Sequence, residues 1–219
     1  MKEIYRIAID GPSGAGKSTI AKAVAARLGI DYIDTGAMYR AVGYKVKAKG
    51  IDADDEAALA SLLNETDIDF RKGDIILDGE IINDKIRTPE ISKMASIVSA
   101  KGPVRAKLVD IQRAMGTRKS IIMDGRDIGT NVLKDAEYKI FLTASVEERA
   151  DRRYRELVAK GQDVNYDDIC RDIEARDHSD RTRELNPLRK ADDAVELDTT
   201  GLDIEQVVAE VMNIVGACD

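Results

Sequence analysis

One stretch near the start of the sequence constrains the fold more than any other: Asp10-Gly11-Pro12-Ser13-Gly14-Ala15-Gly16-Lys17-Ser18-Thr19. It has the G-x-x-x-x-G-K-S spacing of a phosphate-binding loop. A β-rich run at residues 4–9 precedes it, and Ile20, Val24 and Leu28 follow it at helical spacing. The alternative is a glycine-rich strand-to-helix turn that binds nothing. Because pattern, strand and helix agree, the sequence predicts binding of a nucleoside triphosphate.

Each part of this loop has a chemical role in binding phosphate. Glycines let successive backbone N–H groups point at a phosphate, and the dipole of the following helix adds to that field. Lys17 is expected to reach the β- and γ-phosphates, and Ser18 to place its hydroxyl on Mg²⁺. The residues predicted to bind the triphosphate are Gly11, Pro12, Ser13, Gly14, Ala15, Gly16, Lys17, Ser18 and Thr19.

Short β-rich runs alternate with helical patterns along most of the chain. Beyond the first strand, further strands are expected at residues 30–33, 120–123, 138–142 and 194–197. The alternation predicts an α/β fold of the P-loop NTPase type, a parallel sheet with helices on both faces. Asp203, followed three residues later by Gln206, resembles a capping box at the start of the closing helix.

The series is interrupted by three short β-like runs, at residues 68–70, 75–77 and 81–82. Turn residues at 72–74 and 78–80 separate them, as in a small meander with tight turns. We therefore expect a small β-containing insert outside the main sheet. Pro89 stands at a permitted first-turn position of the helix that follows.

Two predicted strands end in polar residues, where an open α/β sheet places ligand groups. After the strand at 30–33, Thr35 and Arg40 could face the phosphate of a second substrate, although Arg40 on a solvated helix face is the alternative. After the strand at 120–123, Asp124 suits holding Mg²⁺ directly or through water. Arg126 is by its chemistry a fork for phosphate.

The segment from residue 149 to residue 189 holds nine of the chain's eighteen arginines, interleaved with acids. They are Arg149, Arg152, Arg153, Arg155, Arg171, Arg176, Arg181, Arg183 and Arg189. Two salt-bridged, solvated helices are one interpretation. Beside a triphosphate loop, the arginines could instead cover the charge that develops in phosphoryl transfer, with the helices closing over the site. In that case we expect the segment to order only with substrates, because its like charges would otherwise face one another.

Composition excludes several other classes of protein. A net charge of -7, a pI of about 5.0, two Phe and no Trp argue against nucleic-acid and membrane-surface binding. No apolar run is long enough to span a membrane, and the early strand leaves no room for a signal peptide. Cys170 and Cys218 form no C-x-x-C pair, so we expect a cytoplasmic protein. His178 is the only histidine, which excludes His-based metal sites and triads.

Taken together, the motifs resemble those of bacterial cytidylate kinases over essentially the whole length. The phosphate-binding loop occurs in many families, whereas the D-G-R-D-x-G-T and R-D-x-x-D-x-x-R motifs are far more specific. The stretches that carry the resemblance are residues 9–17, 34–40, 86–90, 124–130 and 176–183. Many members have Gly-Thr where this chain has Ser18-Thr19, but Ser18 matches the general phosphate-loop pattern. Serine is frequent at the position of Thr35, and there a hydroxyl is retained.

The resemblance implies transfer of the γ-phosphate of ATP to CMP or dCMP, with Mg²⁺, as a monomer in pyrimidine metabolism. It implies a single kinase domain over residues 1–219, with a nucleoside-monophosphate-binding insert at about 64–100 and a lid at about 149–190. Predicted acceptor-phosphate residues are Thr35, Arg40 and Arg126; cytosine residues are Ser96, Arg105, Asp127 and Arg183; sugar residues are Arg176 and Asp180. Predicted catalytic residues are Lys17, Arg126, Arg153 and Arg181, and predicted metal residues are Ser18 and Asp124.

The chemistry of the acceptor separates this reading from its alternatives. A phosphate with a second pKa near 6 is already a dianion at neutral pH and needs no general base. A UMP kinase would share this chemistry, whereas a sugar or shikimate kinase would need a carboxylate base, for which Asp124 or Asp127 could serve. A GTP-dependent switch would need an N-K-x-D motif, which the sequence lacks.

Asp127 carries the predicted choice between cytosine and uracil. A carboxylate accepts a hydrogen bond from the cytosine amino group. With uracil, the carboxylate oxygen would face the carbonyl oxygen of the base, and neither acceptor would receive a hydrogen bond. The alternative is that Asp127 only pairs with Arg183 and positions it.

Overall fold

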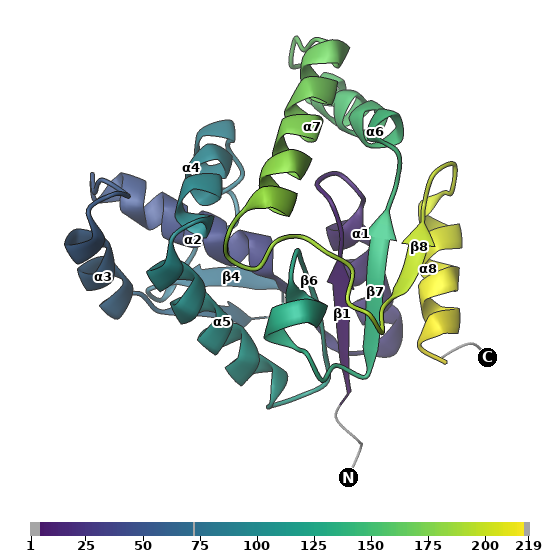
Figure 1. Cartoon of the computed structure of the whole chain (residues 1–219), viewed down its shortest axis with the longest axis horizontal. Coiled ribbons are helices and arrows are strands. Elements are labelled where there is room, and N and C mark those ends of the chain that lie inside the picture. Colours follow the sequence, from purple (N-terminus) through teal and green to yellow (C-terminus); the bar gives the residue numbers. More distant parts are fainter. Residues whose placement is uncertain (1–4, 72, 217–219) are drawn as a thin grey trace. The chain divides into compact units, whose positions relative to one another are not determined.

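The computed structural model describes residues 5–71 and 73–216 (Figure 1). It forms two compact units, one made of residues 1–30 with 121–219 and the other of residues 31–120. Ile4 of the predicted first strand, Lys72 of a predicted turn and Cys218 lie outside the described residues. The predicted insert at 64–100 falls inside the second unit.

The first unit supplies β1 (Arg6–Asp10), β6 (Ile121–Gly125), β7 (Tyr138–Thr143) and β8 (Val195–Asp198) to the main sheet. These strands pair in parallel in the order β6-β1-β7-β8. Ile7, Ile9 and Ile122 are fully buried, as expected of strands covered on both faces. The predicted parallel α/β sheet is confirmed.

Two helices of the first unit pack together, α1 (Lys17–Leu28) and α8 (Ile204–Ile214). Helix α1 ends at Gly29, whose φ of 65° is the left-handed conformation that closes a helix. Helix α8 begins at Asp203, which accepts from the backbone of Gln206 at 2.8 Å while the Gln206 side chain accepts from the Asp203 backbone at 2.9 Å. The predicted capping box is confirmed.

Helices α6 (Val146–Ala159) and α7 (Tyr166–Thr182) form a hairpin that follows β7 (Figure 1). Ala150, Ile169 and Ile173 form a small buried core between them. Tyr154 and Tyr166 meet edge to face at 5.9 Å beside this core. The hairpin therefore has apolar packing of its own.

Five arginines of the hairpin are paired with acids, so for these five the premise that like charges face one another is wrong. The pairs are Arg149 with Asp177, Arg152 with Glu148, Arg153 with Glu156, Arg155 with Asp151 and Arg171 with Asp168. Most lie at i,i+3 or i,i+4 spacing on one helix, where opposite charges are neighbours. For Arg153, Arg155 and Arg171, the structure agrees with the alternative of salt-bridged, solvated helices.

The second unit begins with β2 (Asp31–Asp34) and α2 (Thr35–Ala48), followed by α3 (Glu56–Asn64). Strands β3 (Ile68–Arg71), β4 (Asp74–Leu77) and β5 (Glu80–Ile81) form a separate antiparallel sheet, so the predicted meander is confirmed. Helices α4 (Pro89–Ser99) and α5 (Gly102–Gly116) complete the unit, with Thr88 capping α4 and Pro89 in its first turn.

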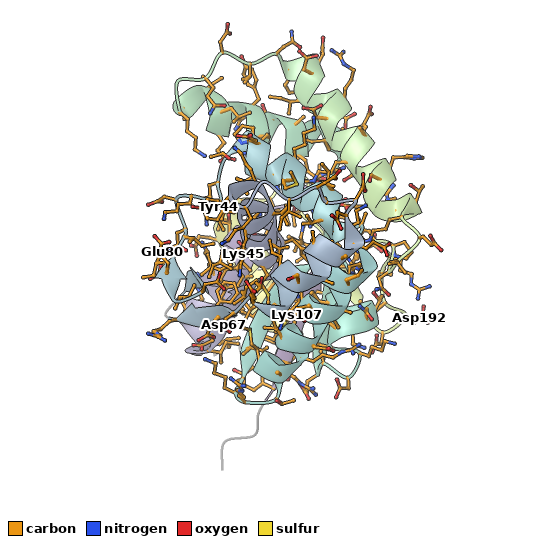
Figure 2. All side chains as sticks on the ribbon, turned by 90° about the vertical axis from the view of Figure 1, so that its left-hand side faces the viewer. Tyr44, Lys45, Asp67, Glu80, Lys107 and Asp192 are labelled. Atoms are coloured by element: carbon orange, nitrogen blue, oxygen red, sulfur yellow. The ribbon has the colours of Figure 1, made fainter. Side chains whose placement is uncertain are left out.

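A buried lysine ties the meander to the helices of the second unit. Lys45 of α2, labelled in Figure 2, donates to the backbone carbonyl of Glu65 at 2.7 Å and pairs with Asp78 at 2.6 Å. Asp78 in turn accepts from the backbone of Asp67 at 2.9 Å. These contacts fix the turn between β4 and β5 against α2. None of the described helices combines the length and apolar character needed to cross a membrane.

Candidate active site

The phosphate-binding loop joins β1 to α1, as predicted. A side chain at Gly11 would place its Cβ 1.9 Å from the carbonyl oxygen of Leu142, so only glycine fits there. Gly16, which directly precedes α1, has a φ of 83°, a conformation that other residues rarely adopt. The loop backbone therefore requires glycine at both of its ends. In this conformation, backbone N–H groups at the N-terminus of α1 are available to bind an anion.

Lys17 is buried at the first position of α1, and its Nζ donates to the carbonyl of Pro12 at 2.7 Å. Burial, and after it the positive charge of Arg126, lower the pKa of Lys17 to about 7. The carboxylates of Asp124, Asp10 and Asp180 act in the opposite direction. A bound polyphosphate would add negative charge at this point and favour the protonated lysine.

Ser18 and Asp124 lie side by side although 106 positions separate them in the chain. The Ser18 hydroxyl donates to Asp124 Oδ2 at 2.8 Å. A hydroxyl and a carboxylate are the hard oxygen ligands that Mg²⁺ prefers, so the two residues predicted for the metal fit such an ion. Among the described residues there is no cluster of three or more Asp, Glu, His or Cys that could hold a metal. Mg²⁺ does not need one, because substrate phosphates and waters complete its shell.

Arg126 and Asp127 follow β6 and contact the end of the α6–α7 region. Arg126 Nε donates to Asp180 at 2.7 Å, and Arg183 Nη2 donates to Asp127 at 3.2 Å. Asn131 Nδ2 donates to the other oxygen of Asp127 at 3.1 Å. Four residues predicted to contact the substrate are therefore brought together, and the Asp127–Arg183 pair that was weighed as an alternative is present.

The turn that carries these residues contains a feature that the sequence analysis missed. Residues Ile128–Val132 form one turn of π-helix, in which the carbonyl of Asp127 accepts from the backbone of Asn131 and Val132 at 2.9 and 3.2 Å. π-Helical turns are rare and frequently occur at functional sites. The backbone N–H groups of Ile128 and Gly129 each donate to Asp10 at 2.8 Å. A carboxylate at the end of a strand whose only other charged residue is Arg6 was the available signal for Asp10.

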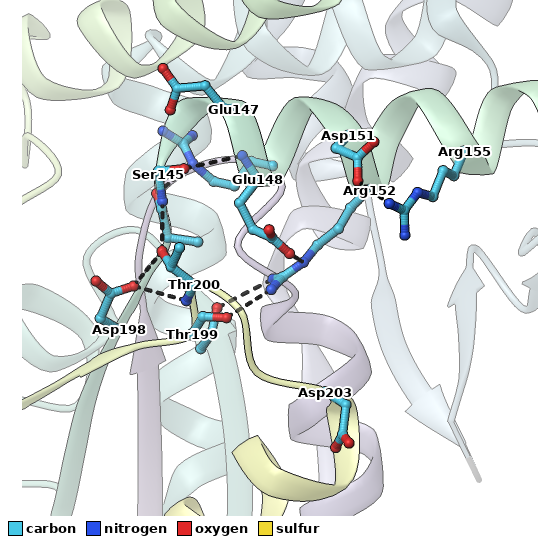
Figure 3. Close-up of polar contacts among 12 residues, drawn as sticks. Ser145, Glu147, Glu148, Asp151, Arg152, Arg155, Asp198, Thr199, Thr200 and Asp203 are labelled. Carbon is cyan, nitrogen blue, oxygen red and sulfur yellow. Dashed lines mark hydrogen bonds and ion pairs between the residues drawn. The ribbon is translucent and has the colours of Figure 1, made fainter.

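Two arginines of α6 contact the phosphate-binding loop and the loop after β8, and neither was among the predicted site residues. Arg149 is buried; it donates to the carbonyl of Ser13 at 2.9 Å and pairs with Asp177 at 2.7 Å. Arg152 donates to the carbonyl of Thr199 at 2.8 Å, as Figure 3 shows. Both belong to the nine arginines of residues 149–189, and no sequence pattern distinguishes these two from the other seven.

The remaining lid residues lie elsewhere on the hairpin. Arg153 pairs with Glu156 at 3.0 Å on the surface of α6, with its side chain 48% exposed. Arg176 and Arg181 are exposed on α7. No contact among the described residues ties Arg153 or Arg181 to the phosphate-binding loop, and their catalytic roles stay predictions.

In the second unit, three residues gather at the N-terminus of α2. Asp34 caps the helix by accepting from the backbone of Ala37 at 2.8 Å and pairs with Arg40 at 3.0 Å. A Cβ at Gly36 would lie 3.2 Å from Arg40 Nη1, so the guanidinium lies over the first turn. Arg40 Nε is buried with no hydrogen-bond partner in the described chain, and Thr35, the first residue of α2, is also buried. A helix N-terminus with an adjacent guanidinium suits an anion.

Two further predicted residues of the second unit lie on α4 and α5. Arg105 is buried, donates to the carbonyl of Ser99 at 3.4 Å and lies over the ring of Tyr39 at 5.7 Å. Ser96 is exposed on α4. Arg105 is thus held by α2 and α4 together, whereas no contact fixes the orientation of the Ser96 side chain among the described residues.

Comparisons with known proteins identify the family of this chain. The sequence model of the cytidylate kinase family matches residues 7–217. The cytidylate kinase of Clostridioides difficile (strain 630) is 52% identical over 207 residues, which cover 94% of this chain and 96% of that protein. The cytidylate kinase of Alkaliphilus oremlandii (strain OhILAs) is 54% identical over 212 residues, covering 97% of this chain and 98% of that protein.

Solved structures extend the likeness to more distant proteins. An uncharacterized protein from Eubacterium ventriosum ATCC 27560 has a TM-score of 0.56 at 12% identity, covering 99% of this chain and 100% of that chain. A shikimate kinase from Bacteroides thetaiotaomicron has a TM-score of 0.50 at 13% identity, covering 98% and 99%. At such identities the likeness concerns the fold alone. The family match and the curated relatives carry the assignment: the chain belongs to the cytidylate kinase family.

Proposed function

We propose that this protein transfers the γ-phosphate of ATP to the phosphate of CMP or dCMP, giving ADP and CDP or dCDP. One observation carries the proposal beyond the family assignment. Strands β1 and β6 are paired with Asp10 opposite Gly125, so the phosphate-binding loop and the Arg126–Asp127 turn leave the sheet at adjacent strand ends. A site for a triphosphate and a fork for a second phosphate therefore start side by side in the first unit.

The reaction forms a bond between an acceptor phosphate oxygen and the γ-phosphorus. It breaks the bond between that phosphorus and the oxygen that bridges to the β-phosphate, which leaves with ADP. The acceptor is a dianion at neutral pH, so no protein group has to remove a proton. What the protein supplies is alignment of the two phosphates and neutralisation of the charge between them. A single histidine and many arginines in the sequence suit this chemistry.

The residues take the following roles in this proposal. Lys17 and the loop backbone bind the donor phosphates, and Arg126 binds the acceptor phosphate through two parallel N–H···O bonds. Asp127 with Arg183 reads the cytosine, and Asp180 with Arg176 meets the sugar. Thr35, Arg40, Ser96 and Arg105 supply contacts from the second unit. Arg153 and Arg181 are assigned to the charge on the transferred phosphoryl group.

Ser18 and Asp124 would hold Mg²⁺, directly or through water, next to the donor phosphates. The ion neutralises charge on the β- and γ-phosphates when it is bound. The hydrogen bond of 2.8 Å from Ser18 to Asp124 keeps both oxygen ligands together for this role.

A sugar or shikimate kinase is not favoured as an alternative. Its acceptor hydroxyl would need a carboxylate base, but Asp127 is engaged by Arg183 and Asn131, and Asp124 accepts from Ser18. The relatives that are about half identical to this chain are cytidylate kinases, whereas the shikimate kinase resembles it in fold only.

The decisive experiment is a coupled assay of ADP release with ATP, Mg²⁺ and one candidate acceptor at a time. CMP, dCMP, UMP, AMP, GMP and shikimate form the panel, and a reaction without acceptor measures hydrolysis. We expect the fastest ADP release with CMP or dCMP and slower release with UMP. Release that is equally fast without acceptor would defeat the proposal. A monomeric state, a cytoplasmic location and a place in pyrimidine metabolism stay predictions of the sequence.

A further inference from the structure

Asp10 is a buried carboxylate with no part in the mechanism above. Its side chain is 5% exposed at the end of β1, directly before Gly11 of the phosphate-binding loop. Oδ1 accepts from the backbone N–H of Ile128 and Oδ2 from that of Gly129, each at 2.8 Å. Both oxygens are thus used, one for each of two consecutive amides on a segment more than a hundred positions away.

The two ends of this contact differ in how firmly the fold holds them. The backbone of Asp10 pairs on both sides, opposite Gly125 of β6 and opposite Phe141 of β7. The turn that begins at Asp127 lies beyond the end of β6 and has no strand pairing of its own. Asp10 is therefore the fixed end, and the turn is the end whose position depends on the contact.

The turn carries the groups that would face the acceptor nucleotide. Arg126 and Asp127 directly precede the two amides that Asp10 binds. If one of the two hydrogen bonds were lost, the turn could rotate and both side chains would move. Small displacements of positioning groups strongly reduce the rate of phosphoryl transfer.

We propose that Asp10 is a positioning residue that holds the turn bearing Arg126 and Asp127 in register with the phosphate-binding loop. The inference rests on the proposed function, because it assigns that turn to the acceptor. It makes one carboxylate the link between the donor loop and the acceptor turn, and it predicts that loss of the link damages use of CMP more than binding of ATP.

The electrostatic surroundings of Asp10 support this role. Burial raises its pKa to about 6, the two backbone N–H groups oppose the shift, Asp127 adds to it and Lys17 opposes it. Lys139 of β7 packs against Gly129, but its Nζ is directed to the carbonyl of Lys134 and to Asp193. Above this pKa the carboxylate offers an acceptor to each amide, and below it one oxygen carries a proton.

Asp10→Asn tests the link at nearly constant size. A carboxamide has one acceptor oxygen and one NH₂ donor, so one of the two backbone N–H groups loses its partner and faces a donor. We expect kcat/KM for CMP to fall at least about tenfold, equivalent to about 1.4 kcal/mol, with the KM for ATP nearly unchanged. Amide hydrogen exchange at Ile128 and Gly129 should accelerate in the variant without either nucleotide.

Asp198→Asn is the matched control. Asp198 ends β8 of the same sheet and accepts from the backbone of Thr200 at 2.9 Å, as Figure 3 shows. It is exposed and faces no residue of the acceptor turn among its described hydrogen bonds. We expect its substitution to leave kcat/KM for CMP and exchange at Ile128 and Gly129 at wild-type values.

Gly129→Ala tests the same contact from its other end if Asp10→Asn does not fold. The added Cβ would lie 3.4 Å from Asp10 Oδ2 and 3.2 Å from Lys139 Cδ, so either the turn or the Lys139 side chain must shift, and hydrogen exchange at Ile128 and Gly129 reports which. The same selective loss of kcat/KM for CMP is expected.

A kcat/KM for CMP that stays at the wild-type value would overturn the inference if it is found in the folded Asp10→Asn variant, or in a Gly129→Ala variant whose exchange at Ile128 and Gly129 is accelerated. Equal losses for ATP and CMP would make Asp10 a structural residue of the loop and would also overturn it. A wild-type protein that fails to phosphorylate CMP would instead defeat the proposed function, and hydrogen exchange would still report whether Asp10 holds the turn.

Discussion

At the scale of single residues, Lys17 shows how the site is prepared for an anion. Its ammonium is buried, lies in the field of Arg126 and has only the carbonyl of Pro12 as a described hydrogen-bond partner. These conditions disfavour its charge, which is why its pKa falls to about 7. Bound phosphates would favour the charged form again, so Lys17 should gain a proton when the donor nucleotide binds.

We predict that ATP binding takes up a proton above pH 7. Below the pKa of free Lys17 the side chain is already protonated, so binding at pH 6 should involve little uptake by this group. Around pH 8 the free lysine is largely neutral and the bound one charged, so uptake should approach one proton. The measurement is the binding enthalpy at pH 8 in buffers of different ionisation enthalpy, whose slope counts protons. Lys17→Met should abolish the slope, and a wild-type slope of zero at pH 8 would contradict the prediction.

Asp127 is the residue on which the choice of base depends. We expect Asp127→Asn to lower the CMP-to-UMP ratio of kcat/KM at least about tenfold, because the amide can donate to the uracil carbonyl and a good base contact discriminates by about 1–3 kcal/mol. Steady-state kinetics with both acceptors measure the ratio.

Arg183→Lys is the comparison, since it weakens the Asp127–Arg183 pair without altering the carboxylate. It should lower the CMP-to-UMP ratio of kcat/KM less than Asp127→Asn does, because the carboxylate that meets the cytosine amino group is retained. If Asp127→Asn slowed both acceptors alike, Asp127 would only position Arg183 and the base would be read by other residues.

At the scale of elements, the α6–α7 hairpin changes the expectation for the lid. Five of its arginines are paired with acids, and Ala150, Ile169 and Ile173 give it a core. Arg149 and Arg152 anchor α6 to the loops after β1 and β8. A hairpin packed in this way does not need substrates in order to fold, although it can still move as a body.

We therefore predict that amides in the middle of α6 and α7 are protected from hydrogen exchange in the free protein. Protection reports local opening, which the small core should resist. Adding ATP analogue and CMP should slow exchange mainly in the loop between the helices, and the loop after β8 serves as an internal reference. Fast exchange throughout α6 and α7 without nucleotides, with protection only in their presence, would restore the original expectation of a segment ordered by its substrates.

The elements were largely predictable because their signals are local. The phosphate-binding loop, the capping box at Asp203, the first-turn Pro89 and the turns of the meander each depend on residues a few positions apart. Contacts between distant segments were not predictable in this way. Asp10 with Gly129, and Arg149 with Ser13, depend on which strands are neighbours and on which arginine of a charged helix faces inward. The π-helical turn after Asp127 also has no sequence signature of its own.

At the scale of the whole molecule, each unit presents its own polar cluster. The first unit joins the phosphate-binding loop, the Ser18–Asp124 pair and the Arg126–Asp127 turn around β1 and β6. The second unit gathers Thr35 and Arg40 at the start of α2 and holds Arg105 between α2 and α4. The clusters suit a reaction between two phosphates, in which cations and N–H donors align the phosphates and neutralise their charge. Such a reaction does not require acid–base groups.

The central claim is transfer of the γ-phosphate to CMP, and the fate of that phosphate tests it most directly. The protein is incubated with Mg²⁺, CMP and ATP labelled on the γ-phosphate, and the labelled products are separated. We expect the label to appear in the β-phosphate of CDP, in an amount equal to that of the ADP formed. Label released as inorganic phosphate at the same rate with and without CMP would contradict transfer to CMP.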